Sequence, residues 1–453
     1  MGIQAYLIII AVTLIAHFRA LRSGYIVDDE AAYRKKVVPA NKAQEIWWQF
    51  MGIKYYEPQL EHLMNLTVHL INCLLIYIAF GRSTASLMAA VLFSVHPAGM
   101  MGSVWLSGRM YAVAAMFALL AYALKAFFPI PYLLGTPFSL SMLLTPLTLL
   151  RTPYWYYIVF IPVFIYLAKY HRGVVKLRYS RATSQAKRLT YKKAIVFCKS
   201  LGYYMCLSLI PTKLGVYHDY LYNYCLTDKD NNEGERVDRF FWIGLIILYL
   251  LITNYIFNYN EAMFGLFWFV LFIAQWCNIM TLQQAIAERY LYLPLAGVMY
   301  MISNMILATT YPGYIYIAIF VYYLTRFQIQ IGSFKNAMNC AEYNILNFPK
   351  LYACWTWKGQ IARESGRFFT ALESWFEGWK LRKNDFRLNN NIAIMLTEMG
   401  FFDDAEGFLN HIEANAIPEQ AENIQKHIAE LRQRIRKARQ KAGYPGLKLP
   451  KRK

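Results

Sequence analysis

Long apolar runs separated by short polar stretches dominate the first 330 residues, and this pattern predicts a membrane domain. A transmembrane helix needs about 20 mostly apolar residues, and roughly eleven segments approach that criterion. They are 3–19, 60–80, 83–96, 110–127, 130–150, 154–169, 194–211, 239–257, 262–281, 290–308 and 313–329. Prolines interrupt the fifth segment, so we expect it to be kinked or re-entrant. The first segment lacks a small-residue cleavage site, which predicts a retained anchor.

After residue 330 the pattern changes to a repeat with a period of 34 residues. Three residue types recur in register, namely Gly332, Gly366 and Gly400, then Phe334, Phe368 and Phe402, then Ala337, Ala371 and Ala405. In helical-hairpin repeats the glycine makes the turn, the aromatic packs it, and the alanine allows close helix approach. We therefore predict tetratricopeptide-like repeats over 331–420, then a helix and a basic tail over 421–453. Such stacks commonly hold extended peptides in a concave groove, although a rigid spacer or a dimer contact is the alternative.

Composition agrees with a membrane protein. Of the 453 residues, 57% are hydrophobic and 16% are charged, whereas soluble domains carry about 25% charged residues. The predicted fold class is all-α: a polytopic transmembrane bundle of GT-C type over 1–330, followed by a tetratricopeptide-like α-solenoid.

The net charge of +20 comes from two local runs. Residues 169–193 hold nine Lys or Arg and residues 432–453 hold ten, and neither run contains an acid. The rest of the chain is close to neutral, so we expect no nucleic-acid partner. Cytoplasmic loops are enriched in Lys and Arg, which places 169–193 inside the cell. Counting helices from that loop gives a cytoplasmic N-terminus and extracytoplasmic repeats, although Arg19, Arg22, Lys35 and Lys36 oppose this orientation.

With this topology, three polar clusters fall on the outer side of the membrane: Asp28 to Glu30, the stretch from His96 to Arg109, and Glu288 to Tyr290. Ionisable residues at such positions are candidates for function. The second segment adds one helix stripe, consisting of His62, Asn65, His69 and Asn72. Interhelical hydrogen bonding explains that stripe at least as well as catalysis does.

Other chemistry leaves little trace in the sequence. The motifs of zinc hydrolysis, of P-loop nucleotide binding and of serine hydrolysis are absent. A disulfide between Cys340 and Cys354 is conceivable but has no further support.

Several stretches together resemble one family. They are Tyr25 to Asp29, His62 to Asn72, His96-Pro97 with Trp105 to Arg109, Ser200 to Tyr204 with Pro211 and Leu214, Phe264 to Phe269, and Ala287 to Pro294. In this order, the chain resembles the multi-spanning, tetratricopeptide-bearing O-mannosyltransferases and their bacterial relatives. These belong to the GT-C class of polyprenyl-phosphate-sugar-dependent glycosyltransferases.

The resemblance implies an inverting transfer of a sugar, with mannose as a candidate, from a polyprenyl-phosphate carrier to a hydroxyl of an acceptor protein. Asp28 would be the general base, with Asp29 as the next choice, and Arg109 and Arg289 would bind the lipid phosphate. The further substrate-binding candidates are His62, His69, His96, Glu288 and Tyr292. The membrane lipid and an acceptor peptide on the repeats are the implied partners. No cofactor or metal is expected, although the acidic cluster could hold a hard cation through oxygen.

The chain departs from the family pattern at three places. Acidic residues often found after the His-Pro pair and after the arginine are replaced by Met101 or Gly102 and by Tyr111, and the usual lysine is replaced around Thr136-Pro137. A second hypothesis is therefore an inactive membrane scaffold that binds a partner through its repeats. A third, a lipid or polymer transporter, lacks the inverted repeat that would favour it.

Overall fold

The computed structural model describes residues 2–26, 29, 58–136, 138–162, 165, 190–222, 236–257, 260–279, 284–415 and 421–443. Helices and turns, without a strand, make up these residues. The chain divides into two compact units, Met1–Cys340 and Ala341–Lys453. The all-α prediction is thus confirmed for the described part of the chain.

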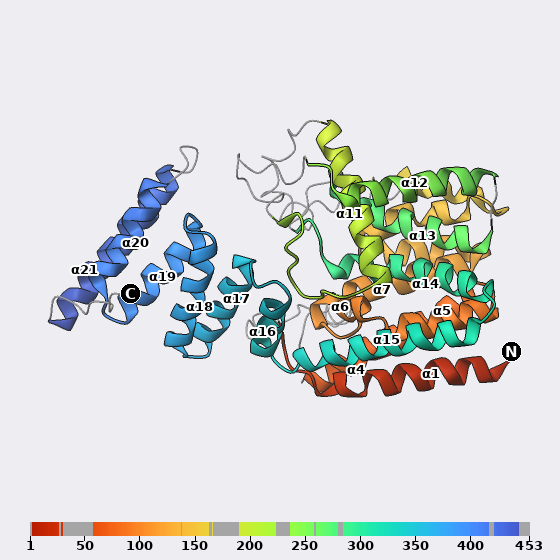
Figure 1. Ribbon diagram of the computed structural model, residues 1–453, viewed down its shortest axis with the longest axis horizontal. Helices are drawn as coiled ribbons and strands as arrows, with labels where there is room; N and C mark the ends of the chain where they lie inside the picture. The colour runs from red at the N-terminus through yellow and green to blue at the C-terminus, as the bar shows by residue number, and fades with distance from the viewer. Residues whose placement is uncertain are drawn as a thin grey trace. The chain divides into compact units, whose positions relative to one another are not determined.

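The first unit is a bundle of apolar helices (Figure 1). Its α-helices are α1 (Ile3–His17), α4 (Pro58–Ala79), α5 (Thr84–Val95), α6 (Met100–Ser103), α7 (Arg109–Ala123), α8 (Pro129–Gly135), α11 (Thr190–Leu209), α12 (Arg239–Phe257), α13 (Glu261–Ala274), α14 (Tyr292–Leu307) and α15 (Pro312–Ser333). Short 3₁₀ turns join or extend them: η1 (Phe18–Arg22), η2 (Pro97–Gly99), η3 (Leu106–Gly108), η4 (Lys125–Phe127), η5 (Leu140–Leu149), η6 (Trp155–Val159) and η10 (Glu288–Leu291). A π-turn, η9 (Gln275–Ile279), extends α13.

Five stretches of the described residues are long and apolar enough to cross a membrane. They are Ile3–Arg22, Pro58–Ala79, Leu106–Ala123, Glu261–Asn278 and Glu288–Leu307. A sixth is formed if Thr84–Val95 and Pro97–Ser103, which meet at a bend of 65°, count as one broken span. The membrane prediction is supported, while the total of eleven spans stays a prediction.

The fifth expected segment, 130–150, is not one continuous helix. It contains α8, which starts at Pro129, and the separate 3₁₀ turn η5, which contains Pro146. Proline lacks a backbone N–H and breaks the hydrogen-bond ladder of an α-helix. The break that the prolines predict is therefore present.

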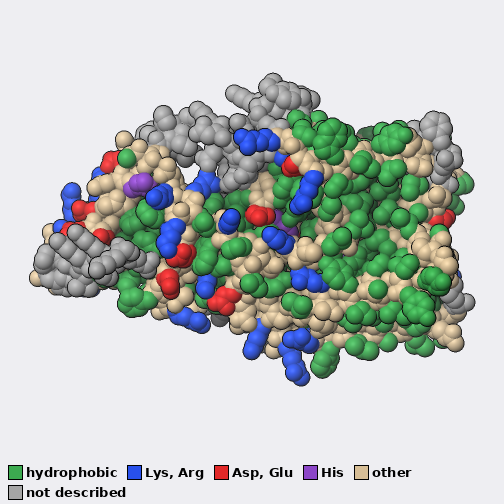
Figure 2. Space-filling model, in the orientation of Figure 1, with side chains coloured by type: hydrophobic (Ala, Val, Ile, Leu, Met, Phe, Trp, Pro, Cys, Tyr) green, Lys and Arg blue, Asp and Glu red, His purple; other side chains and the backbone are tan. Residues whose placement is uncertain are grey.

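The outer surface of this unit is apolar. Figure 2 shows broad hydrophobic areas over its helices. Large side chains with at least half of their surface exposed include Ile3, Leu7 and Ile15 on α1, Trp242, Ile246 and Tyr249 on α12, and Tyr314, Ile317 and Val321 on α15. Exposed apolar faces of this extent fit contact with lipid rather than with water.

Small residues allow close helix packing between α13 and α14. A Cβ atom added at Gly297 would meet the Gly265 carbonyl oxygen at 2.5 Å and the Trp268 side chain at 2.8 Å. Trp268 in turn donates from Nε1 to the Leu293 carbonyl, at 3.1 Å. Glycine pairs of this kind bring helix backbones together where lipid provides no hydrophobic driving force.

Several helix ends meet at one end of the bundle, opposite the end where α1 begins (Figure 1). Gln328 on α15 donates to the Ala16 carbonyl at 2.8 Å, and the Gly24 amide donates to the Lys335 carbonyl at 3.1 Å. We call this region the polar end; its described residues are 17–26, 29, 58–65, 96–109, 210–222, 284–292 and 326–340. The three sequence-predicted polar clusters therefore share one end of the bundle, as far as their residues are described.

The second unit is a series of helices that pack on their neighbours: α16 (Ala337–Asn347), which begins just before the unit boundary, α17 (Tyr352–Glu364), α18 (Phe368–Leu381), α19 (Phe386–Glu398), α20 (Phe402–Ala414) and α21 (Ala421–Ala442). Gly366 and Gly400 have φ of +73° and +84° and lie in the turns after α17 and α19. These two glycines have the turn role that the repeat predicts, because left-handed backbone favours glycine. Gly332 instead lies inside α15, which continues past it.

The repeated alanines Ala371 and Ala405 are fully buried, and Phe402 is buried as well. Phe368, in the equivalent position of the preceding repeat, is 46% exposed. Cys340 and Cys354 are both buried free thiols, so they form no disulfide.

We expect Gly297→Leu to lower the free energy of unfolding by about 1–3 kcal/mol, because the added side chain would force α13 and α14 apart. Thermal unfolding in detergent would measure the change. Gly313→Leu is the matched control, since a Cβ atom at Gly313 has nothing within 4 Å. Equal melting temperatures for the two variants would contradict the close packing.

Candidate functional site

The segment Val104 to Ser107 is the centre of the polar end. Asp29 is fully buried, and its Oδ1 accepts hydrogen bonds from the Ser107 backbone N at 3.2 Å and from the Ser107 Oγ at 2.8 Å. Its Oδ2 accepts from the Ile26 amide at 3.3 Å. Hydrogen bonds to the ionised form compensate for the loss of water around a buried carboxylate. Asp28, the first-choice base, lies outside the described residues.

Arg109 forms an internal ion pair. Its Nη2 lies 2.6 Å from the Glu61 Oε2, and the two side chains are 1% and 0% exposed. Arg109 also donates from Nε to the Asn65 Oδ1 at 2.5 Å and from Nη2 to the Glu61 carbonyl at 2.9 Å. Asn65 itself donates to the Trp105 carbonyl at 3.1 Å. These contacts connect the beginning of α4 with the start of α7. They also use the Nε and Nη2 donors of Arg109 within the protein.

Arg289, in contrast, has no carboxylate partner among the described residues. Its guanidinium carbon lies 4.9 Å from the centre of the Tyr290 ring and 6.0 Å from that of Trp105. It donates hydrogen bonds to the Tyr290 hydroxyl, at 3.3 Å, and to the Tyr111 hydroxyl. Because the side chain is only half-buried, it is a cation that aromatic faces hold in place while its charge remains unneutralised.

Two further polar side chains, Trp105 and His62, are buried at this end. The Trp105 Nε1 has no hydrogen-bond partner, whereas the His62 ring lies beside backbone groups of Ser23, Gly24 and Val104. Leaving a buried donor unsatisfied costs about 1–3 kcal/mol. Such exceptions are rare in folded proteins and often mark the place of a water or a ligand.

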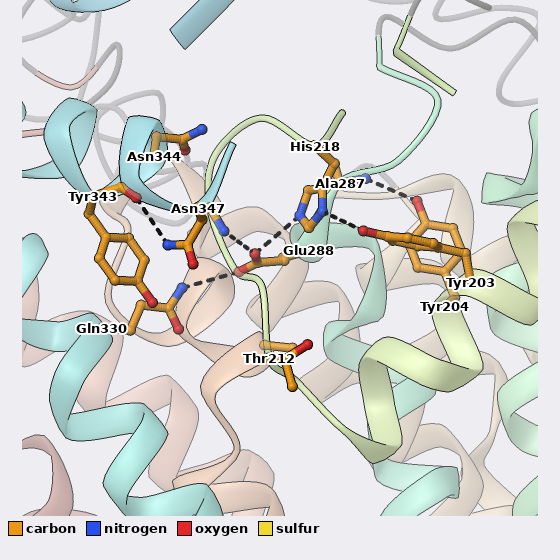
Figure 3. A network of polar contacts seen from close by, with 12 residues as sticks. Tyr203, Tyr204, Thr212, His218, Ala287, Glu288, Gln330, Tyr343, Asn344 and Asn347 are labelled. Atoms are coloured by element: carbon orange, nitrogen blue, oxygen red, sulfur yellow. Dashed lines mark hydrogen bonds and ion pairs between the residues drawn. The ribbon is translucent and has the colours of Figure 1, made fainter. Parts of the chain in front are cut away.

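Glu288 is the centre of a buried network (Figure 3). Its Oε1 accepts from the Gly215 amide and, at 3.1 Å, contacts the Nε2 of His218. The Nδ1 of His218 lies 3.2 Å from the Tyr203 hydroxyl. The Oε2 of Glu288 accepts from Gln330 on α15, at 3.2 Å.

This network fixes the chain on both sides of Glu288. The preceding Ala287 amide donates to the Tyr204 hydroxyl at 3.0 Å (Figure 3), and Arg289 follows directly. Glu288 is fully buried. Glu288 therefore fixes the position of Arg289 through the backbone. Both of its carboxylate oxygens already have hydrogen-bond partners within the protein.

The remaining sequence candidates are engaged in helix contacts. The Nδ1 of His69 lies 2.6 Å from the Tyr292 hydroxyl, which also accepts from Asn72 at 3.2 Å. His96 contacts the Ser208 carbonyl at 3.0 Å through Nε2 and accepts from the Ala98 amide through Nδ1, at the bend after α5. These bonds match the interhelical alternative that the stripe on α4 suggested.

Two of the buried carboxylates of the polar end, Asp29 and Glu288, act on a common neighbour. Burial raises the pKa of the Cys340 thiol above its ordinary value, and the negative charges of Glu288 and Asp29 raise it further. Asp29 and Glu288, far apart in sequence, thus act electrostatically on the same thiol. Among the residues that the structure describes, no group of three or more His, Cys, Asp or Glu is arranged to hold a metal ion.

Comparison with protein-family models, with characterised proteins and with solved structures gives no match.

Glu61 and His218 are the two site residues that sequence reasoning missed. Glu61 is a lone acid near the start of an apolar segment, which was a usable signal. His218 lies in a polar stretch between segments, and nothing in the sequence connects it with Glu288.

We expect Glu61→Leu to lower the free energy of unfolding by about 3–5 kcal/mol, because it leaves the Arg109 charge buried and unpaired. The double variant Glu61→Leu/Arg109→Met should recover most of that loss. Unfolding of the unaltered chain, of Glu61→Leu, of Arg109→Met and of the double variant in detergent, analysed as a double-mutant cycle, measures the coupling. Additive losses in the double variant would show that the two side chains do not depend on each other.

Proposed function

We propose that the chain is a membrane glycosyltransferase that moves a sugar, with mannose as a candidate, from a polyprenyl-phosphate carrier to a hydroxyl of an acceptor protein. The main observation behind the proposal is that a carboxylate and a cation both contact one short segment, Val104 to Ser107. The buried carboxylate of Asp29 contacts Ser107, and the unneutralised Arg289 stacks on Trp105, two residues away. The sequence resemblance to GT-C enzymes supports the same assignment.

The proposed reaction needs a base and a cation. A carboxylate of the Asp28-Asp29 pair accepts the proton of the acceptor hydroxyl as that oxygen attacks the anomeric carbon. The bond from the anomeric carbon to the phosphate oxygen breaks with inversion, and polyprenyl phosphate leaves with the bonding electron pair. Asp29 is the base that the described residues support, because its contacts hold the carboxylate in one orientation.

Arg289 is the better of the two arginines for the leaving phosphate. Arginine stays charged and forks onto phosphate oxygens, but the fork of Arg109 is already engaged with Glu61 and Asn65. The unpaired indole N–H of Trp105, beneath Arg289, supplies a neutral donor for the same phosphate. Glu288, His218 and Gln330 serve this site by fixing the backbone that carries Arg289.

The finer architecture belongs to the same proposal. It comprises about eleven membrane spans of GT-C type, a cytoplasmic N-terminus, and tetratricopeptide-like repeats outside the cytoplasm that present the acceptor. The positive charge at 169–193 supports the orientation. The turn glycines Gly366 and Gly400 support the repeats.

An inactive scaffold is the competing function. Two observations favour it: Met101 or Gly102, and Tyr111, stand where the resembled family often has acidic residues, and Asp29 is completely buried. The scaffold predicts partner binding without any new glycosidic bond.

We expect Asp29→Asn to lower sugar transfer by about 10²–10⁴-fold, because the amide cannot accept the acceptor's proton. The chain and its variants are co-expressed with exported host proteins, whose intact masses report added hexose. Asp28→Asn tests the alternative base in parallel. Glu373→Gln is the control, since it makes the same chemical change on an exposed helix of the second unit. Hexose addition that survives both aspartate substitutions would overturn the proposed base.

We expect Trp105→Phe to weaken binding of polyprenyl phosphate by roughly tenfold or more, because one hydrogen bond to a charged group contributes about 1.5–3 kcal/mol. Phenylalanine keeps a ring under Arg289 but removes the N–H. Binding is measured with the purified chain in detergent, so the result does not depend on turnover. Trp242→Phe, on the lipid-facing side of α12, is the control. Unchanged affinity in the Trp105 variant would remove the indole from the phosphate site.

A further inference from the structure

Helix α21 (Ala421–Ala442) has one apolar face, and that face is used within the second unit. Ile428, Leu431 and Ile435 are buried at spacings of three and four residues. The helix packs on α20 and α19. This burial fixes which side of α21 faces its own unit.

Two cations on the borders of that face form ion pairs with α20. The Arg432 Nη2 lies 2.8 Å from Glu413, and the Arg439 Nη2 lies 2.6 Å from Asp403. Both pairs hold α21 in one rotation about its axis. The charge of these two arginines is therefore balanced within the unit.

The opposite face carries more cations than acids. At about 100° per residue, Lys426, Arg434, Lys437 and Lys441 fall on the side away from the buried isoleucines. All four are exposed, and within the described residues none has an acidic partner; Arg436 is exposed on the flank. Glu422 and Glu430 are the acids on this side of the helix. The sequence after α21 adds Lys448, Lys451, Arg452 and Lys453 without an acid.

We propose that this face of α21, here called the basic face and defined by Lys426, Arg434, Lys437 and Lys441, docks on anionic lipid headgroups. Clustered lysines and arginines on an amphipathic helix are attracted to negatively charged bilayers. The partner is a lipid surface because the same chain carries the membrane-spanning unit, and covalent attachment keeps lipid at high effective concentration. Lipid binding by the basic face requires no catalysis, so the experiment tests it independently of the proposed transferase activity.

The experiment uses the full chain in nanodiscs of phosphatidylcholine alone or of phosphatidylcholine with phosphatidylserine. The rate of tryptic cleavage after Arg436 is measured in each. We expect cleavage to be at least about fivefold slower in the anionic nanodiscs, with the difference removed by high salt, because exposed charges are screened.

The variant Lys426→Gln/Arg434→Gln/Lys437→Gln/Lys441→Gln keeps Arg436 and should lose the difference between the two lipids. Arg367→Gln/Arg387→Gln, which removes two exposed cations elsewhere in the second unit, should keep it. The readout is the ratio of rates between the two lipids, so a variant that frays α21 raises both rates without imitating the effect. Equal rates in both nanodiscs for the unaltered chain, or a ratio that the fourfold variant leaves unchanged, would overturn the proposal.

Discussion

Burying charged and polar groups in an apolar bundle is the constraint on which the polar end depends. Each such group loses its water, and in a surrounding of low polarity that loss is tolerated only with a partner of good geometry. The Arg109–Glu61 pair meets this condition with a 2.6 Å contact and added bonds to Asn65 and to the Glu61 carbonyl. Glu288 meets it with His218, Gly215 and Gln330. Because the partners come from different helices, satisfying the charges also fixes how the helix ends meet.

The same constraint separates framework residues from candidates for ligand binding. Arg109 and Arg289 have the same chemistry and lie at the same end of the bundle, but only Arg109 has a carboxylate partner among the described residues. Arg289 is held by ring faces, which position a cation without cancelling its charge. Beside it lies the unsatisfied N–H of Trp105. The site therefore offers donors without an anionic acceptor among the described residues, and a phosphate would supply one. This imbalance, rather than the number of polar residues, distinguishes the proposed phosphate position.

Local patterns were enough to predict much of the fold. The apolar segments, the break caused by Pro129 and Pro146, and the turns at Gly366 and Gly400 follow from residues close together in sequence. Gly332 shows the limit of the repeat pattern, because an apolar helix runs through it. Of the candidate site, sequence indicated Asp29, Arg109 and Arg289. It could not indicate that Glu61 neutralises Arg109 or that His218 binds Glu288, since those partners lie 48 and 70 positions apart.

The basic residues near the C-terminus follow a different rule from the buried charges. In the polar end Arg109 and Glu61 compensate each other, and in α21 the two arginines beside the apolar face have ion-pair partners as well. The remaining cations of α21 are exposed and contribute repulsion to one another rather than attraction to the fold. A helix with a buried apolar face needs no such charge to be stable, because its packing supplies that stability. A partner outside the unit would relieve this mutual repulsion, and the proposed surface of negative headgroups would relieve it for all four residues of the basic face together.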